Sequence, residues 1–349
     1  MQRVPLHLKV LSSAMTSPVL ILFFNRPDTL AQVFAAVREA RPPMLFLYQD
    51  GARGEKDLAG IAACREVVSH IDWPCQVHRL YQERNYGCDP SEFISQRWAF
   101  GEVERCIVLE DDDVPSQSFF TFCDAMLERY KDDERVGMIS GFNTDEKTTD
   151  IGADDYFFTT NFSIWGWASW RRVVAAWDEH YTWLDDPTAV ARIEALSRER
   201  KLRSDFLPMC RTHRDSGKAY YETIFHAHLL LHSQMAIVPR VNMIRNIGVS
   251  DDSTHFGGSI ATLPHAYRRI FTMSAHDLDT AHLTAPAHII DHTAYRKRVY
   301  RTCCWGHPWL KVARSIEELW LNLKYGNYRR ITKAARERIS IWLGGRNWH

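Results

Sequence analysis

The segment Val19-Leu-Ile-Leu-Phe-Phe-Asn-Arg-Pro-Asp28 joins an apolar run to a polar turn and the start of a helix. Six consecutive apolar residues bounded by a turn are typical of a buried strand. The next apolar residues, Leu30, Val33, Phe34 and Val37, recur at the spacing of one helical face. This strand-turn-helix unit decides the fold because its pattern repeats along the first half of the chain.

The same alternation predicts further strands and helices. Strands are expected at 44–49, 76–81, 106–109 and 136–140, and helices at 55–69, 90–100 and 117–130. Strand–helix alternation predicts an α/β fold with an open, mostly parallel, Rossmann-like sheet and helices on both faces. The regular alternation fades after about residue 150.

The composition is that of a soluble globular protein. The chain has 349 residues, of which 45% are hydrophobic and 25% charged, so disorder and collagen-like repetition are excluded. The 43 Lys and Arg balance the 43 Asp and Glu, and no overall field attracts nucleic acid. The balance hides an asymmetry, because residues 295–349 carry 13 basic and 3 acidic side chains, a net +10. The body before them is therefore acidic.

The cysteines and the N-terminal residues bear on location. The eight cysteines include no Cys-x-x-Cys pair, which indicates neither a zinc site nor a disulfide framework and fits a reducing compartment. The first residues lack the apolar core of a signal peptide, and no uncharged run approaches the roughly 18–20 residues of a membrane span. We expect a cytoplasmic protein, with peripheral attachment to the inner face of the membrane as a further hypothesis.

Three polar clusters follow predicted strands, namely Asn25-Arg26, Asp50-Gly51 and Glu110-Asp-Asp-Asp113. Open α/β sheets bind ligands beyond the carboxyl ends of their strands. Unit charges about 4 Å apart repel by ~4 kcal/mol at a protein surface, so the third cluster needs a positive partner. Mg²⁺ or Mn²⁺ completed by substrate phosphates is one interpretation, and a solvated acidic turn before the next helix is the other.

The order of these motifs resembles a known fold. Asn-Arg, then Gln-Asp-Gly, then Arg97-Trp-Ala-Phe-Gly101, then the acidic cluster followed by Pro115 and Phe119-Phe120 resembles the glycosyltransferase-A fold of nucleotide-sugar transferases. Over about residues 17–260 the chain is most similar to the mannoside N-acetylglucosaminyltransferase I family and its bacterial glycosyltransferase relatives.

The resemblance implies roles for individual residues. It assigns Arg26 to the nucleotide, Asp50 to the uracil edge, Asp111 to the ribose or donor sugar, and Asp112 to the metal, with a UDP-sugar as donor. Asn25, Arg97 and Glu110 belong to the same motifs and are included among the donor-binding residues. A surface turn capped by Arg26 and a plain turn at Asp50 remain the alternatives.

Farther along, Trp165-Gly-Trp-Ala-Ser-Trp170 places three indoles within six residues. Indole faces stack on sugar rings, and a glycine permits close approach of the backbone. In related families a Gly-Trp segment lines the donor-sugar or acceptor pocket, which makes Trp165, Gly166 and Trp167 candidates. Packing in the core is the alternative.

The resemblance also places a base and a second metal ligand. Gly217-Lys-Ala-Tyr-Tyr-Glu222 resembles the segment that carries the catalytic carboxylate, which makes Glu222 the candidate base, with Asp185 and Asp186 as substitutes. The family often has Trp-Asp where this chain has Tyr-Glu. His255 matches a histidine that contacts the metal or diphosphate, although chance placement among 16 histidines is the alternative.

The basic tail contains two apolar stripes at helical spacing. They are Val312, Ile316, Leu319, Trp320 and Leu323, and then Ile331, Ala335, Ile339 and Trp342. Tryptophan and basic residues on amphipathic helices favour an anionic membrane surface. Packing against the acidic body remains the other interpretation.

Together these patterns predict a metal-dependent glycosyltransferase that moves a sugar, with inversion, from a UDP-sugar to a glycan or lipid-linked acceptor in surface polysaccharide or glycoconjugate synthesis. The expected catalytic domain spans 15–265, with a nucleotide half at 17–145 and an acceptor half at 146–265. A C-terminal extension spans 266–349 and is helical and basic from about 295. A sugar-phosphate nucleotidylyltransferase, which would show a Gly-rich loop after the first strand, and a non-catalytic carbohydrate- or membrane-binding protein are the alternatives.

Overall fold

A computed structural model of the chain describes residues 7–9, 15–161, 163–199, 206–249, 260–328, 330–332 and 336. These residues divide into two compact units. The first unit contains the described residues up to Gly248 together with Met273–Val299, and the second contains those of 249–272 and 300–349. The first stretch of the first unit therefore ends at Gly248, whereas the expected domain boundary was residue 265. The later segment Met273–Val299 also belongs to the first unit.

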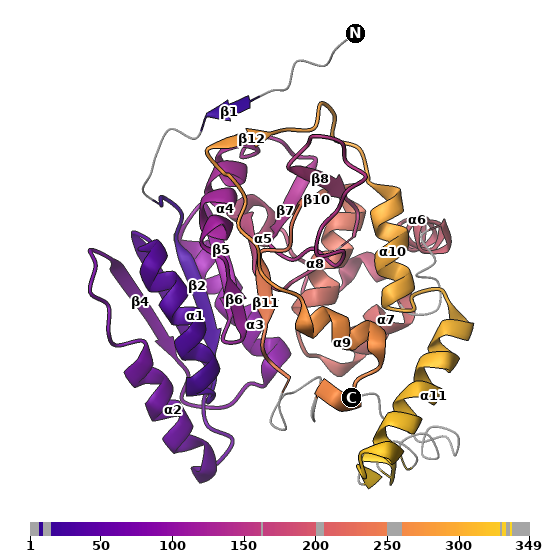
Figure 1. Ribbon diagram of the computed structural model, residues 1–349, viewed down its shortest axis with the longest axis horizontal. Coiled ribbons are helices and arrows are strands. Elements are labelled where there is room, and N and C mark those ends of the chain that lie inside the picture. Colours follow the sequence, from indigo (N-terminus) through magenta and orange to yellow (C-terminus); the bar gives the residue numbers. More distant parts are fainter. Residues whose placement is uncertain are drawn as a thin grey trace. The chain divides into compact units, whose positions relative to one another are not determined.

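The first unit is built on an eight-stranded sheet (Figure 1). In spatial order its strands are β4 (Gln76–Tyr81), β3 (Met44–Gln49), β2 (Val19–Phe23), β5 (Arg105–Glu110), β9 (Trp167–Trp170), β7 (Val136–Ser140), β10 (Met235–Pro239) and β8 (Tyr156–Thr159). The first four are parallel to one another, and β7 is parallel to β10. β9 runs antiparallel to both β5 and β7, and β8 runs antiparallel to β10. The predicted α/β fold with a mostly parallel sheet is confirmed, and the order is compatible with a Rossmann-like fold.

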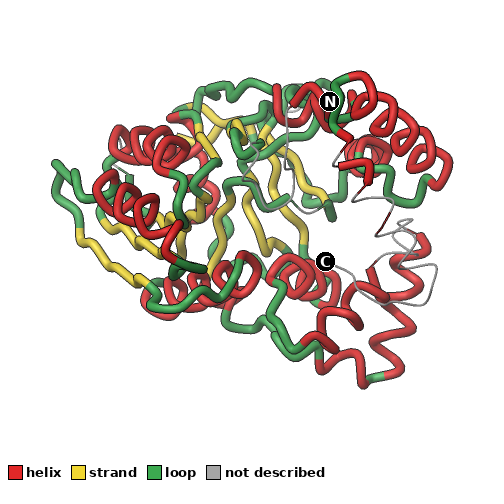
Figure 2. The backbone as a smooth tube through the Cα atoms, turned by 90° about the horizontal axis from the view of Figure 1, so that it is seen from below, coloured by secondary structure: helices red, strands yellow, loops and turns green. Residues whose placement is uncertain are grey.

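Helices lie on both faces of this sheet (Figure 2). They are α1 (Pro27–Ala40), α2 (Glu55–Val67), α3 (Cys88–Glu102), α4 (Gln117–Arg129), α5 (Arg171–Val174), α6 (Pro187–Glu199), α7 (Phe206–Ser216) and α8 (Tyr221–Leu231), with a 3₁₀ turn at Thr182–Asp185. α1 contacts α2 and α4, whereas α3 contacts α5 and α8. The apolar stripe predicted for the first helix, from Leu30 to Val37, is buried on α1.

The sheet core is apolar because its central strands are covered on both sides. All five residues of β2 and of β7 are buried. Full burial of each aliphatic side chain contributes about 1.5–3 kcal/mol to stability, which explains why these strands are continuous apolar runs rather than alternating ones.

Two further pairs of short strands in the described residues are antiparallel. β6 (Asp113–Pro115) pairs with β11 (Ile244–Asn246), and Asn246 lies opposite Asp113. β1 (His7–Lys9) pairs with β12 (His282–Thr284). The β6–β11 pair begins at Asp113, the last residue of the acidic cluster.

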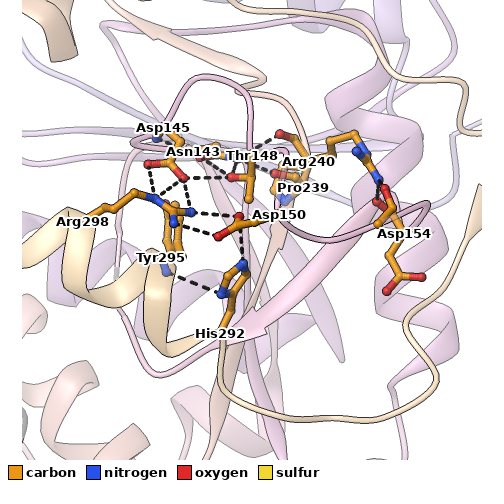
Figure 3. A network of polar contacts seen from close by, with 11 residues as sticks. Asn143, Asp145, Thr148, Asp150, Asp154, Pro239, Arg240, His292, Tyr295 and Arg298 are labelled. Atoms are coloured by element: carbon orange, nitrogen blue, oxygen red, sulfur yellow. Dashed lines mark hydrogen bonds and ion pairs between the residues drawn. The ribbon is translucent and has the colours of Figure 1, made fainter.

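A polar network joins the segment Met273–Val299 to the loop after β7 (Figure 3). Arg298, on α10 (Thr293–Thr302), donates hydrogen bonds to Asp145 (2.7 Å) and Asp150 (2.8 Å). His292 Nε2 lies 3.2 Å from Asp150 Oδ1. Asn143 donates to the carbonyl of Pro239 at the end of β10 (2.8 Å). These contacts hold the loop and the start of α10 against the sheet.

The second unit contains a 3₁₀ turn at Ile260–Thr262, α9 (His265–Thr272) and α11 (Pro308–Lys324). The first predicted apolar stripe of the tail lies on α11. Of the second stripe, Ile331 is described, and the other three residues lie outside the described part of the chain. No helix in the described ranges has both the length and the apolar character that crossing a membrane requires.

Candidate functional site

The motifs that follow β2 and β5 meet at the carboxyl edge of the sheet. Arg26, the residue before α1, contacts Asp111 and also donates to Asp112 Oδ2 at 2.8 Å. The backbone N–H of Phe24 donates to Asp111 at 3.4 Å. Three residues that the sequence predicted as donor-binding or metal-binding are thus brought together.

β11 covers the same carboxylates from another side. Asn246 Nδ2 donates to Asp112 Oδ1 (3.0 Å) and Asp113 Oδ1 (3.1 Å). The N–H of Gly166 donates to Asp113 Oδ2 (2.9 Å). A Cβ atom at Gly248 would lie 2.1 Å from Asp112 Oδ2, so this approach of the backbone requires glycine. Asn246 and Gly248 therefore position Asp112.

Burial and mutual repulsion perturb the cluster. Burial, followed by the charges of neighbouring carboxylates, raises the pKa of Glu110 and of Asp113 well above the ordinary range. Burial also raises the pKa of Asp111 to about 6, although Arg26 opposes the shift. Negative charge is therefore costly here.

Two carboxylates from other elements join this electrostatic group. Glu92, on α3, is buried and accepts a hydrogen bond from the Cys88 thiol at 3.5 Å. Its pKa is raised by burial and then by the charge of Glu222, in the first turn of α8. Burial, Glu92, Glu110 and Glu222 likewise raise the pKa of the buried Tyr221 hydroxyl. The charge of the candidate base therefore acts on Glu92, whose own charge acts on Glu110 of the acidic cluster.

Sequence reasoning missed Glu92. Its signal was an acidic residue directly before Phe93 and Ile94, two apolar residues that the predicted helix at 90–100 was expected to bury. A buried carboxylate in such a position is uncommon without a partner or a function.

The two substitute bases have other contacts. Asp185 accepts a hydrogen bond from Arg214 at 3.0 Å in an exposed ion pair. Asp186 accepts from the N–H of Thr188 (2.8 Å) at the start of α6. The geometry therefore favours Glu222 over both.

Asp50 lies at the end of β3, but its carboxylate is already hydrogen bonded. Its oxygens accept from the N–H groups of Gly51, Tyr86 and Gly87 and from the Asn85 side chain, at 2.8–3.2 Å. These bonds fix the loop between β4 and α3. Hydrogen bonding to a uracil would require exchange of one of these donors.

Asn25 and Arg97 were also predicted to bind the donor, but their described hydrogen bonds are made to α2 and to the end of α5. Asn25 Nδ2 donates to Asp57 on α2 (2.9 Å). Arg97 donates to the carbonyls of Val174 and Ala175 at the end of α5, both at 2.9 Å. Each of these bonds joins neighbouring elements of the fold.

The tryptophan segment divides between core and loop. Trp167 is 1% exposed and packs against Phe100 and Phe225, with ring centroids 6.1 and 5.2 Å away. Trp167 is therefore a core side chain, as the alternative interpretation of this segment expected. Gly166 has a φ of 59°, in the region that favours glycine, and Trp165 packs edge-on against Phe142.

The metal prediction rests on oxygen ligands. His255 lies outside the described residues. In the described part, no group of three or more His, Cys, Asp or Glu side chains is arranged to hold a metal ion. The donor set fits Mg²⁺ or Mn²⁺ in kind, because these ions bind through one or two carboxylates and take further ligands from phosphates and water. Asp112, the residue expected to hold the metal, has such a carboxylate, and Asp111, expected at the ribose or donor sugar, is its neighbour in the chain.

A cavity of 790 Å³ opens beside Gly51, directly after Asp50. Its lining includes Leu58, Ile61, Arg65 and Tyr81, and the Arg65 guanidinium lies 4.6 Å from the Tyr81 ring centroid. Its size falls within the range of small-molecule sites.

No model of a known protein family matches the chain, and no curated protein matches it. The family that the motifs resemble remains a prediction.

Proposed function

We propose that the protein is a glycosyltransferase of the glycosyltransferase-A type, which transfers a sugar from a UDP-sugar to a glycan or lipid-linked acceptor in surface polysaccharide or glycoconjugate synthesis. One observation carries the proposal, namely the contact of Arg26 with Asp111 and Asp112 at the carboxyl edge of the sheet. Such an edge is where open α/β sheets bind nucleotides.

Each part of the proposed UDP-sugar donor has side chains of suitable chemistry. The Arg26 guanidinium offers a fork of N–H donors to diphosphate oxygens. Asp112, with Asp111 beside it, would hold Mg²⁺ or Mn²⁺, which when bound supplies charge neutralisation to the leaving diphosphate. The cavity beside Gly51 offers apolar and aromatic side chains to the nucleoside.

Glu222 is the proposed base. Its carboxylate accepts the proton of the acceptor hydroxyl while the acceptor oxygen forms a bond to C1 of the donor sugar. The bond from C1 to the diphosphate oxygen breaks, and UDP leaves with the electron pair. Attack from the face opposite the leaving group inverts the configuration at C1.

Glu92 supports this assignment. Two close carboxylates do not ionise independently, and the more buried one holds its proton more tightly. Burial, followed by the charge of Glu222, raises the pKa of Glu92 strongly, so we assign the proton of this pair to Glu92, the more buried of the two.

The test is enzymatic. Purified protein is incubated with a UDP-sugar and Mn²⁺, and released UDP is measured with and without chelator. Metal-dependent release of UDP supports the proposal. Absence of release from UDP-sugars, together with absence of binding to them, would reject it.

A further inference from the structure

In α11, whose course Figure 1 shows, most of the large apolar side chains are exposed rather than buried. The side chains of this helix that make described hydrogen bonds to α9 are polar, and Leu321 is its buried apolar side chain. Arg314 donates to the Tyr267 hydroxyl at 2.6 Å, and Glu317 accepts from the N–H of His265 at 2.9 Å. Asn322 is buried. The hydrogen bonds of Arg314 and Glu317 attach α11 to α9.

The exposed face of the same helix is apolar. It consists of Trp309, Val312, Ile316, Leu319, Trp320 and Leu323. Trp309 is 83% exposed, Ile316 63% and Trp320 56%. These positions repeat at helical spacing, so the side chains form one continuous stripe. Single exposed apolar residues are ordinary, but a contiguous stripe of six marks an interaction surface.

Positive charge adjoins the stripe. Lys324 ends α11, and its ammonium lies 5.1 Å from the Trp320 ring centroid. From Lys324 to His349 the sequence has seven Lys or Arg residues and one Glu, a net +6. This charge disfavours a second copy of the chain as the occupant, because two chains that each carry +6 beside the stripe in sequence repel one another. An anionic surface would relieve the same charge.

We propose that the exposed face of α11, from Trp309 to Leu323, binds the surface of an anionic lipid bilayer. Interfacial helices bury tryptophan and aliphatic side chains about 5–10 Å into the boundary between headgroups and acyl chains, with basic residues near the anionic headgroups. Each Lys or Arg near such a surface strengthens binding roughly fivefold. This inference does not depend on the transferase activity, and it places a lipid-linked acceptor within the reach of such an enzyme.

The experiment measures co-sedimentation of the full-length protein with vesicles. Phosphatidylcholine vesicles are compared with vesicles that also contain phosphatidylglycerol, at low and high salt. We expect binding that requires phosphatidylglycerol and weakens in high salt. The triple variant Trp309→Ser, Ile316→Ser, Trp320→Ser should bind at least about a hundredfold more weakly, because three exposed apolar side chains no longer enter the interface.

A matched control is Ile290→Ser. This residue of the first unit is 67% exposed, and its replacement should leave vesicle binding unchanged. Should circular dichroism show that the triple variant is unfolded, Lys324→Glu decides the question, since it changes one exposed side chain by two units of charge and should weaken binding roughly 25-fold.

Equal binding of the folded triple variant and the wild type overturns the proposal, as does binding indifferent to phosphatidylglycerol. A wild-type dimer that the triple variant dissociates, without vesicle binding by either protein, would identify a second copy as the occupant instead.

Discussion

Arg26 Nη2 lies 2.8 Å from Asp112 Oδ2, which joins the residue before α1 to the second residue after β5. These residues are separated by 86 positions in the sequence. Their contact requires β2 and β5 to lie side by side, which they do in parallel. Because burial still raises the pKa of Asp111 beside this guanidinium, the cluster can accommodate additional positive charge.

The first prediction concerns Asp112. Asp112→Asn keeps the shape of the side chain but removes a carboxylate, so Mn²⁺-dependent binding of UDP should be lost while the melting temperature stays close to that of the wild type. Calorimetric titration with UDP, with and without Mn²⁺, measures the effect. Asp132→Asn, at an exposed position, is the matched control. An Asp112→Asn protein whose UDP affinity keeps its Mn²⁺ dependence would remove Asp112 from the metal site.

A second prediction follows from the close approach at Gly248. Gly248→Ala places a methyl group where Asp112 Oδ2 now lies, so the carboxylate or the backbone must move. We expect UDP affinity in Mn²⁺ to fall at least about tenfold, with a stability cost of about 1–3 kcal/mol typical of overpacking. Gly217→Ala is the comparison variant. Gly217 has open space around it but a φ of 68°, so alanine strains the backbone there without touching Asp112. Unchanged affinity in Gly248→Ala would mean that Asp112 tolerates displacement.

Local periodicity explains what the sequence could predict. The strands expected at 44–49 and 76–81 are β3 and β4 with the same bounds, because the spacing of apolar residues and the turn residues that bound a strand are local signals. β9 was not predicted as a strand. Its antiparallel pairing with β5 and β7 depends on partners about 30 to 60 residues away, and a short aromatic segment fits a core strand and a binding loop equally well.

The candidate site was predictable in its residue types and less so in its contacts. Arg26 and Asp112 follow strands, and adjacency of parallel strands brings their ends together. Nothing in the sequence around Asp50 indicates that Asn85 and Gly87 satisfy its carboxylate. Glu92 was missed because its importance arises from Glu222, which reaches it only through the packing of α3 on α8.

The third prediction concerns the base. Glu222→Gln keeps the size of the side chain but does not accept the acceptor proton, so turnover should fall by ~10²–10⁴-fold. Donor affinity should change little, because the nucleotide-binding groups remain. Steady-state transfer and equilibrium UDP binding separate the two effects. Asp185→Asn should keep near-normal turnover, and the opposite ranking of these two variants would transfer the role to Asp185.

The fourth prediction concerns acid stability. Burial, and then the neighbouring His232, lowers the pKa of His228 to about 4. The unfolded chain takes up this proton below pH 6.5 while the folded chain does not, so stability is full above pH 6.5 and falls as the pH drops toward 4. At pH 5 the loss is about 2 kcal/mol.

Urea denaturation at pH 7 and pH 5 tests this directly. The difference in unfolding free energy between the two pH values should be about 2 kcal/mol smaller in His228→Asn than in the wild type. His180→Asn, whose side chain is 80% exposed, should keep the wild-type difference. Identical pH dependence in all three proteins would show that His228 does not contribute to it.

The most direct test of the central claim is a thermal-shift screen of UDP-, GDP- and dTDP-sugars, with and without Mn²⁺. A ligand that binds the folded state alone stabilises it by mass action, by ~2.7 kcal/mol at a hundredfold excess over Kd. We expect UDP-sugars to raise the melting temperature by several degrees with Mn²⁺ and much less without it. A shift with GDP- or dTDP-sugars alone would contradict the choice of nucleotide, and the absence of a shift with every nucleotide-sugar would contradict the transferase itself.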